Sequence, residues 1–149
     1  YKGETYQFDP ISSVPGSVQK PHPPILIGGI ANPALRRVIR YGDGWLAVAL
    51  DAIRMKERLS TLKQLCESTG RVFDDLDLVY KIFINPGEAK KGPFGEREIG
   101  SGSEQQIIDD LKSILDAGFS SIIVRYRGDS AKAQQLQMER FAEKIIPRL

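Results

Sequence analysis

Residues 25–45 read ILIGGIANPALRRVIRYGDGW and contain a complete strand–helix–strand pattern. The apolar run Ile25–Ile27 predicts a short strand buried in a parallel sheet. The dipeptide Asn32–Pro33 predicts the start of a helix, with the asparagine as N-cap and the proline in the first turn. Gly42 predicts the end of that helix, and Asp43–Gly44 turns the chain into the next strand. This stretch therefore predicts an α/β fold.

The same alternation continues to the C-terminus. Further strands are expected at residues 45–50, 76–84 and 121–127. A helix at residues 51–68 is expected to be capped by Asp51 and ended by Gly70, and a helix at residues 103–118 to start with the capping box Ser103–Gln106. A last helix is expected at residues 130–146, with Leu136 on its buried face. Strands that alternate with helices predict a parallel sheet with helices packed on it. A closed eight-unit barrel takes roughly 250 residues. About four strand–helix units therefore predict half of a (β/α)8 TIM barrel, and an open four-stranded α/β sheet is the alternative.

Two segments interrupt this alternation. Residues 1–24 are rich in Pro, Gly and Ser and predict an extended arm, with a short hairpin around Tyr6 and Phe8. The half-barrel then occupies residues 25–149. Within it, residues 86–102 form a polar, glycine-rich loop that is longer than a strand–helix turn requires. Its Glu96-Arg97-Glu98 run is expected to be solvated, with a lid over a site as the alternative.

The composition narrows the classes of function. Of the 149 residues, 41% are hydrophobic and 27% charged, which excludes a disordered chain. A net charge of +2 gives no reason to expect nucleic acid or an anionic membrane as partner. No apolar run approaches the ~18 residues of a membrane helix. Cys66 is the single cysteine, so we expect no internal disulfide and a cytoplasmic location. His22 is the single histidine, is expected to be structural or solvated, and leaves no metal site in prospect.

The glycine pair Gly28–Gly29 is the first candidate for a binding site. Glycines at the end of a parallel strand let a ligand approach the backbone, and the following helix directs its free N–H groups to the same place. Arg36 and Arg37 lie one turn inside that helix and can add positive charge. These features suit a phosphate group. The alternative is a tight turn capped by Asn32, with two solvated arginines.

Four stretches carry a family resemblance. PHPPILIGG (residues 21–29) and ALRRVIRYGDGW (residues 34–45) resemble the signature of luciferase-like flavin and deazaflavin oxidoreductases, and are most similar to the branch presumed to use coenzyme F-420. YKGETYQF (residues 1–8) resembles the segment before this strand, and residues 101–124 resemble the last helix and strand of that family. The resemblance implies the C-terminal half of a (β/α)8 barrel.

The resemblance also implies a cofactor site. Strand-end glycines in that family hold the phosphate of FMN or F-420, which gives here Gly28, Gly29, Asn32 and Ala34. The stretch after GDGW lines the pocket floor, which gives here Leu46, Ala47 and Val48. A complete member has four more strands on the N-terminal side, and these supply much of the ring site and most polar groups near the reacting carbon. The catalytic residues are therefore unknown from this chain, which we expect to be inactive alone.

Basic residues on the predicted strands complete the expected substrate pocket. Lys81 lies among apolar residues of the third strand, where it either faces the barrel interior as a contact for an anionic substrate or extends to the rim. Arg125 and Arg127 end the fourth strand, at the catalytic end of such a barrel, and one of them is expected to face a ligand. Trp45 is expected in the core. The predicted substrate-pocket residues are Ala47, Val48, Lys81 and Arg125.

The expected function is hydride transfer to or from a small organic substrate, or oxygen insertion in the flavin branch, with the cofactor supplying the chemistry. The alternative is a non-catalytic half-barrel that binds a phosphate-bearing ligand or assembles with a partner chain. Helices on one side leave the other sheet face uncovered. We therefore expect the chain to pair with the missing N-terminal half-barrel or with a second copy as a homodimer.

Overall fold

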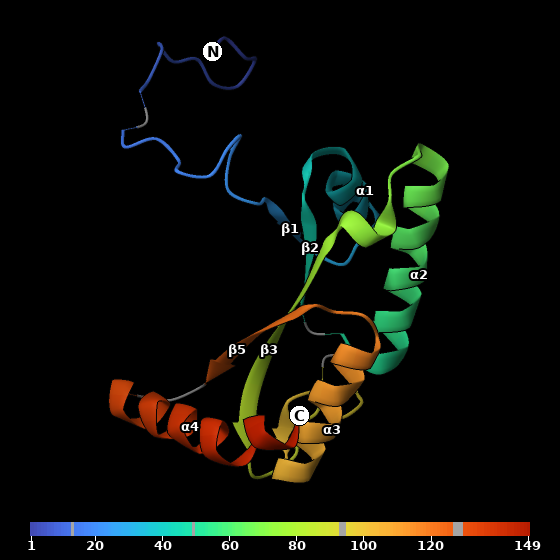
Figure 1. Cartoon of the computed structure of the whole chain (residues 1–149), viewed down its shortest axis with the longest axis vertical. Helices are drawn as coiled ribbons and strands as arrows, with labels where there is room; N and C mark the ends of the chain where they lie inside the picture. The colour runs from blue at the N-terminus through green and yellow to red at the C-terminus, as the bar shows by residue number, and fades with distance from the viewer. Residues whose placement is uncertain (13, 49, 93–94, 127–129) are drawn as a thin grey trace.

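The computed structural model describes residues 1–12, 14–48, 50–92, 95–126 and 130–149. Its centre is a parallel sheet (Figure 1). The four main strands lie side by side in the order β1 (Leu26–Gly28), β2 (Gly44–Val48), β3 (Asp77–Pro86) and β5 (Ser121–Tyr126). A two-residue strand, β4 (Ser101–Gly102), pairs with the end of β3. The predicted α/β class, with about four parallel strands, is confirmed.

Helices follow the strands along the chain. They are α1 (Asn32–Tyr41), α2 (Ala52–Thr69), α3 (Glu104–Asp116) and α4 (Ala131–Lys144), with short 3-10 turns at Phe73–Asp75 and Ile146–Arg148. Buried residues of all four helices form one core cluster with one side of the sheet, the side that carries Trp45, Tyr80 and Ile82. No helix among the described residues contributes to a core on the opposite side, which we call the open face.

Predicted capping residues explain two of the helix starts. The Asp51 side chain accepts a hydrogen bond from the Arg54 amide at the start of α2, at 2.8 Å. Ser103 and Gln106 form the expected capping box at the start of α3. Gly70 ends α2 in the left-handed conformation, with φ of 72°. These three predictions are confirmed.

Three local predictions are wrong. Ala31, not Asn32, is the N-cap of α1, because Asn32 already lies inside the first turn. The first strand is not buried on both faces: Ile25 is 43% exposed, since β1 pairs only with β2 among the described strands. Leu136, expected on the buried face of α4, is 66% exposed, because α4 buries Phe141 instead.

The predicted loop of residues 86–102 is shorter than expected and carries hydrogen-bonded structure. β3 continues to Pro86, and the Asn85 amide donates to the Gly100 carbonyl at 2.9 Å. Within the loop, Lys91 and Arg97 form an antiparallel bridge, and the Glu98 amide donates to Lys90. Residues 93–94, including Phe94, lie outside the described residues.

The predicted arm lies away from the sheet (Figure 1). Its described residues include the expected hairpin, in which Lys2 bridges Gln7 and the Tyr1 and Phe8 rings stack at 5.3 Å. The division of the chain into an arm and a half-barrel at residue 25 stays a prediction.

Candidate functional site

The glycine turn after β1 is held in place by a tryptophan. Gly28 is the last residue of β1, and α1 begins four residues later at Asn32. The Trp45 indole is fully buried, as expected, and its Nε1–H donates to the Gly29 carbonyl at 2.8 Å. The tryptophan of the GDGW motif therefore fixes the position of the glycine turn, a contact that the sequence analysis did not predict.

The fold requires glycine at position 29 but not at position 28. Gly29 has a φ of +112°, and a Cβ there would lie 2.9 Å from the Ala34 Cβ, so the fold itself requires glycine. A Cβ at Gly28 would meet no atom within 4 Å. The missing side chain at Gly28 therefore leaves open space at the surface, which a ligand can enter.

Free backbone amides follow this space. Among the described residues, the amides of Ile30, Ala31 and Asn32 have no hydrogen-bond partner. The next two amides, of Ala34 and Leu35, both donate to the Ala31 carbonyl, at 2.8 and 3.2 Å. Free amides at the start of a helix attract anions, because their partial positive charges add to the helix dipole. The donor set at this turn fits a phosphate.

The remaining residues of the predicted cofactor site have structural partners. The Asn32 side-chain oxygen accepts a hydrogen bond from Arg58 of α2 at 3.0 Å. Ala34 is buried beneath the turn, so its methyl group supports Gly29 from inside. Arg36 and Arg37 are exposed on α1. Gly28, Gly29 and Asn32 thus form the accessible part of this site, and Ala34 lies behind it.

The GDG motif positions β1 and β2. Asp43 Oδ2 accepts a hydrogen bond from the Ile25 amide at 2.7 Å. A Cβ at Gly44 would lie 2.2 Å from the Asp77 carbonyl oxygen, so the close approach of β2 and β3 requires glycine there. His22 Nδ1 lies 3.9 Å from Asp43 Oδ2, with both side chains about half exposed. His22 therefore lies beside a structural carboxylate at the surface.

The alternation of side chains along β2 separates two residues that were predicted to share a pocket. Ala47 is fully buried and belongs to the core cluster beneath the helices. Val48 is only partly buried and lies outside that cluster, as Leu46 does. Because neighbouring residues of a strand point to opposite faces, Ala47 cannot line a pocket on the open face with Val48. That part of the pocket prediction is wrong for Ala47.

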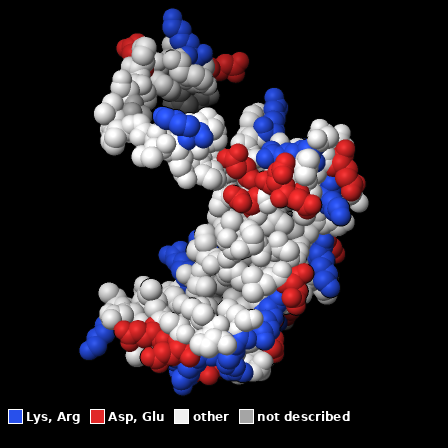
Figure 2. Space-filling view, viewed as in Figure 1, with Lys and Arg blue, Asp and Glu red and all other residues white. Residues whose placement is uncertain are grey.

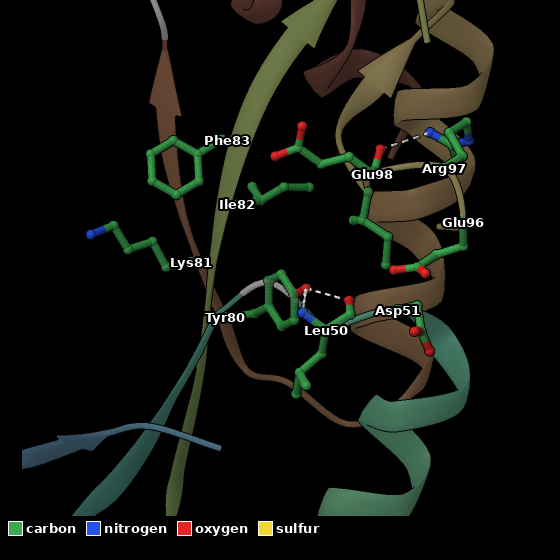
Figure 3. Close-up of a pocket in the computed structure, with 10 residues that line it drawn as sticks. Leu50, Asp51, Tyr80, Lys81, Ile82, Phe83, Glu96, Arg97 and Glu98 are labelled. Carbon is green, nitrogen blue, oxygen red and sulfur yellow. Dashed lines mark hydrogen bonds between the residues drawn. The ribbon is translucent and has the colours of Figure 1, made fainter. Parts of the chain in front are cut away.

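Lys81 and Arg125, two predicted pocket residues, meet on the open face. The Lys81 Nζ lies 5.7 Å, and the Arg125 guanidinium carbon 5.5 Å, from the centre of the Phe83 ring. Figure 3 shows the side chains of Lys81 and Phe83 leaving β3 on the side opposite Tyr80. Lys81 is partly exposed and Arg125 exposed. Arg127, the alternative to Arg125, lies outside the described residues.

A small cavity lies on the other side of β3, at the middle of the strand, and is lined by Tyr80, Ile82 and residues 96–99 of the loop. Its volume is about 40 Å³, enough for a few water molecules but not for a flavin ring. The Tyr80 hydroxyl beside it donates to the Leu50 carbonyl at 2.6 Å and accepts the Leu50 amide at 3.0 Å (Figure 3). Burial raises the pKa of Tyr80 to about 12, which keeps the hydroxyl protonated.

The charge run of residues 96–98 is not simply solvated. Arg97 donates to both carboxylate oxygens of Asp110, with an Nη1–Oδ2 distance of 2.9 Å, and Asp110 also accepts the Gly100 amide at 2.8 Å. The bond to Asp110 raises the pKa of Arg97 further. Asp110 is 8% exposed. The expectation that all three charged side chains are solvated is wrong for Arg97. Its partner Asp110 lies on α3, and the sequence of the loop alone does not show that the two side chains meet.

Two kinds of feature are absent from the described part of the chain. No group of three or more His, Cys, Asp or Glu side chains there is arranged to hold a metal ion. None of the helices described has the length and apolarity that crossing a bilayer requires.

Comparisons with known proteins identify relatives. The family model of the luciferase-like monooxygenases matches residues 1–92. An uncharacterized protein of Mycobacterium tuberculosis is 27% identical over an alignment of 157 positions, which spans the whole of this chain but 46% of that protein. The chain thus spans about half the length of the curated relatives that it matches.

Solved structures share the fold. An F420-dependent secondary alcohol dehydrogenase, in complex with an F420-acetone adduct, superposes with a TM-score of 0.73 at 12% identity, over 99% of this chain and 55% of that one. A riboflavin lyase with modified FMN gives a TM-score of 0.67 at 10% identity, over 99% and 47%. At these identities the likeness shows the fold alone. The parallel sheet with alternating helices is therefore a partial (β/α)8 barrel.

Proposed function

Because this chain belongs to the luciferase-like monooxygenase family, we propose that it is the C-terminal half of a (β/α)8-barrel oxidoreductase that uses FMN or the deazaflavin coenzyme F-420. The reaction is hydride transfer or monooxygenation of a small organic substrate. The observation that carries this proposal is the glycine turn, where open space at Gly28 adjoins three free amides. The alcohol dehydrogenase and the riboflavin lyase, similar in fold, are described with F420 and FMN ligands.

In this proposal the chain holds the cofactor and leaves the redox chemistry to it. The bound cofactor supplies the two-electron chemistry. Gly28 and Gly29 let the phosphate approach the backbone, and the amides of residues 30–32 neutralise part of its charge. Trp45 keeps the Gly29 carbonyl fixed, so the turn is formed before the phosphate arrives.

The open face supplies one wall of the pocket. Val48, Lys81 and Arg125 lie on it, on strands that run side by side from β2 to β5. The cavity behind Tyr80 is too small for a cofactor ring, so the ring is proposed to lie over the open face. Because the chain spans about half of its relatives, the missing N-terminal half-barrel or a second copy is proposed to close the pocket. The chain alone is proposed to be inactive.

The clean test of the phosphate site is Gly28→Asp. A Cβ at Gly28 meets no protein atom within 4 Å, so we expect the turn to keep its shape, whereas Gly29→Asp would also strain it. A carboxylate about 5 Å from a phosphate repels it by ~3 kcal/mol at an effective dielectric constant of ~20. We expect at least tenfold weaker FMN binding in equilibrium dialysis, with riboflavin, which lacks the phosphate, unaffected.

The matched control is Gly16→Asp, which adds the same charge at an equally open position in the arm. It is expected to bind FMN as the wild type does. Equal FMN affinity in the wild type and Gly28→Asp would refute the phosphate site. A parallel titration with F-420 separates the flavin from the deazaflavin branch.

The second candidate function is a non-catalytic half-barrel that binds a phosphate-bearing ligand or assembles with a partner chain. The observation that favours it is the chain's coverage of only 46% of its curated relative. The visible absorbance spectrum of the purified protein distinguishes the oxidoreductase from the non-catalytic half-barrel. A flavin or deazaflavin band supports the oxidoreductase, and phosphate binding without such a band supports the alternative.

A further inference from the structure

Two basic side chains share one aromatic ring on the open face. Lys81 precedes Phe83 by two residues on β3, and Arg125 of β5 is the direct cross-strand partner of Phe83. The alternation of a strand and this register place all three side chains on the same side. Both cations lie within 6 Å of the ring centre, the range in which a ring attracts a cation.

Neither cation forms an ion pair with a carboxylate of the described residues. In the residues that the structure covers, the ion pairs involve His22, Arg54, Arg97 and Arg140, and no carboxylate pairs with Lys81 or Arg125. Two like charges at one ring repel each other, and the ring offsets this repulsion only in part. The uncompensated positive charge of Lys81 and Arg125 therefore attracts anions.

We infer that Lys81 and Arg125 bind a carboxylate or phosphate group of the ligand that occupies the open face. This inference rests on the proposed function, since it assigns the chemical class of a ligand in the same pocket. The planar guanidinium can bind such a group through two parallel hydrogen bonds, and the lysine adds a point charge. Phe83 holds both cations in place and shields one side from water. Arg125 is next to the last residue of β5, at the end of the strands where such barrels bind ligands.

This anion site is separate from the glycine turn. Strand β2 lies between β1, which ends at Gly28, and β3, which carries Lys81. Neighbouring strands lie about 4.8 Å apart, so β1 and β3 are separated by roughly 10 Å. One ligand can therefore place its phosphate at the turn while a second presents its anionic group to Lys81 and Arg125. The source of that group, substrate or cofactor, is distinguished by the experiment.

The test follows backbone and side-chain NMR signals of the 149-residue chain during titration with benzoate, a planar carboxylate. Benzamide, its neutral counterpart, is the control ligand. We expect benzoate, but not benzamide, to shift the signals of Phe83, Ile123 and the Arg125 guanidinium. Lys81→Gln and Arg125→Gln each weaken benzoate binding about tenfold, and raising the salt concentration weakens it in the wild type. Arg40→Gln is the matched control variant, because Arg40 lies 5.1 Å from the Tyr41 ring on the exposed surface of α1.

Each outcome decides the inference. Equal shifts by benzamide, unchanged affinity in Lys81→Gln and Arg125→Gln, or no shift on β3 and β5 overturns it. Displacement of benzoate by FMN but not by riboflavin assigns the anion to the cofactor phosphate, and simultaneous binding assigns it to the substrate. Loss of FMN binding with benzoate binding intact refutes the proposed function alone, because the benzoate signals do not depend on the glycine turn.

Discussion

A single hydroxyl joins β3 to the start of α2. Tyr80 is buried, and its hydroxyl binds both the amide and the carbonyl of Leu50, the residue before the Asp51 cap. Replacing the tyrosine with phenylalanine leaves both backbone groups of Leu50 without a partner in a buried place. Such a loss typically costs about 1–3 kcal/mol.

The raised pKa of Tyr80 predicts a loss of stability at high pH. Its pKa rises from an ordinary 10 to about 12 in the fold, because burial opposes the phenolate. The stability that this contributes is fully present below pH ~10 and is lost as the pH rises toward 12, by up to ~1.4 kcal/mol per pH unit. Urea unfolding, followed by circular dichroism, is expected to show a larger loss between pH 9 and 11 for the wild type than for Tyr80→Phe. Equal losses in the two proteins would contradict the assignment.

Single residues also show what the sequence could and could not predict. The glycine pair could be proposed as a binding site because glycines at a strand end, followed by a helix start, let a ligand approach the backbone. The hydrogen bond from Trp45 to Gly29 was not predicted, because it joins residues 16 positions apart and depends on how β1 and β2 pair. The meeting of Lys81 and Arg125 likewise depends on the register of β3 against β5, which a single sequence leaves open.

At the scale of elements, the Arg97–Asp110 ion pair ties the loop after β3 to α3. Asp110 is nearly buried and accepts hydrogen bonds from both Arg97 and the Gly100 amide. Helix caps were predictable because they are local patterns, such as the Ser103–Gln106 box. Strand β4 was not predictable, because two residues are too few to show an alternation of apolar and polar side chains, and they pair only with the end of β3.

Breaking this tie is expected to expose the loop to protease. Asp110→Asn removes the charge that holds Arg97 and weakens the contact to α3. We expect trypsin to cut at Lys90 or Lys91 several times faster than in the wild type, since cleavage requires local opening. Asp116→Asn, exposed at the end of α3, is the control and keeps the wild-type rate. A rate unchanged by Asp110→Asn means that other contacts hold the loop.

At the scale of the whole molecule, no helix of the described residues covers the open face. Figure 2 shows uncharged surface over the middle of the molecule, between the strands and helices α2 and α3 as Figure 1 places them, with charged groups gathered above and below it. Ile123 on this face is 45% exposed, and Leu136 and Met138 of α4 are also exposed. Covering an apolar patch on the order of 400 Å² contributes about 10 kcal/mol at ~25 cal/mol per Å². That is comparable to the net stability of a domain, ~5–15 kcal/mol.

Sedimentation equilibrium of the chain at micromolar concentration tests the half-barrel most directly. We predict a dimer or larger species, because a second copy covers the open face when the N-terminal half is absent. Ile123→Lys adds a third positive charge to the face that carries Lys81 and Arg125 and is expected to shift the species toward monomer, whereas Ile53→Lys, at an exposed position on α2, is not. A 16.6 kDa monomer that unfolds cooperatively, unchanged by Ile123→Lys, would contradict the half-barrel, because its sheet would then need no partner.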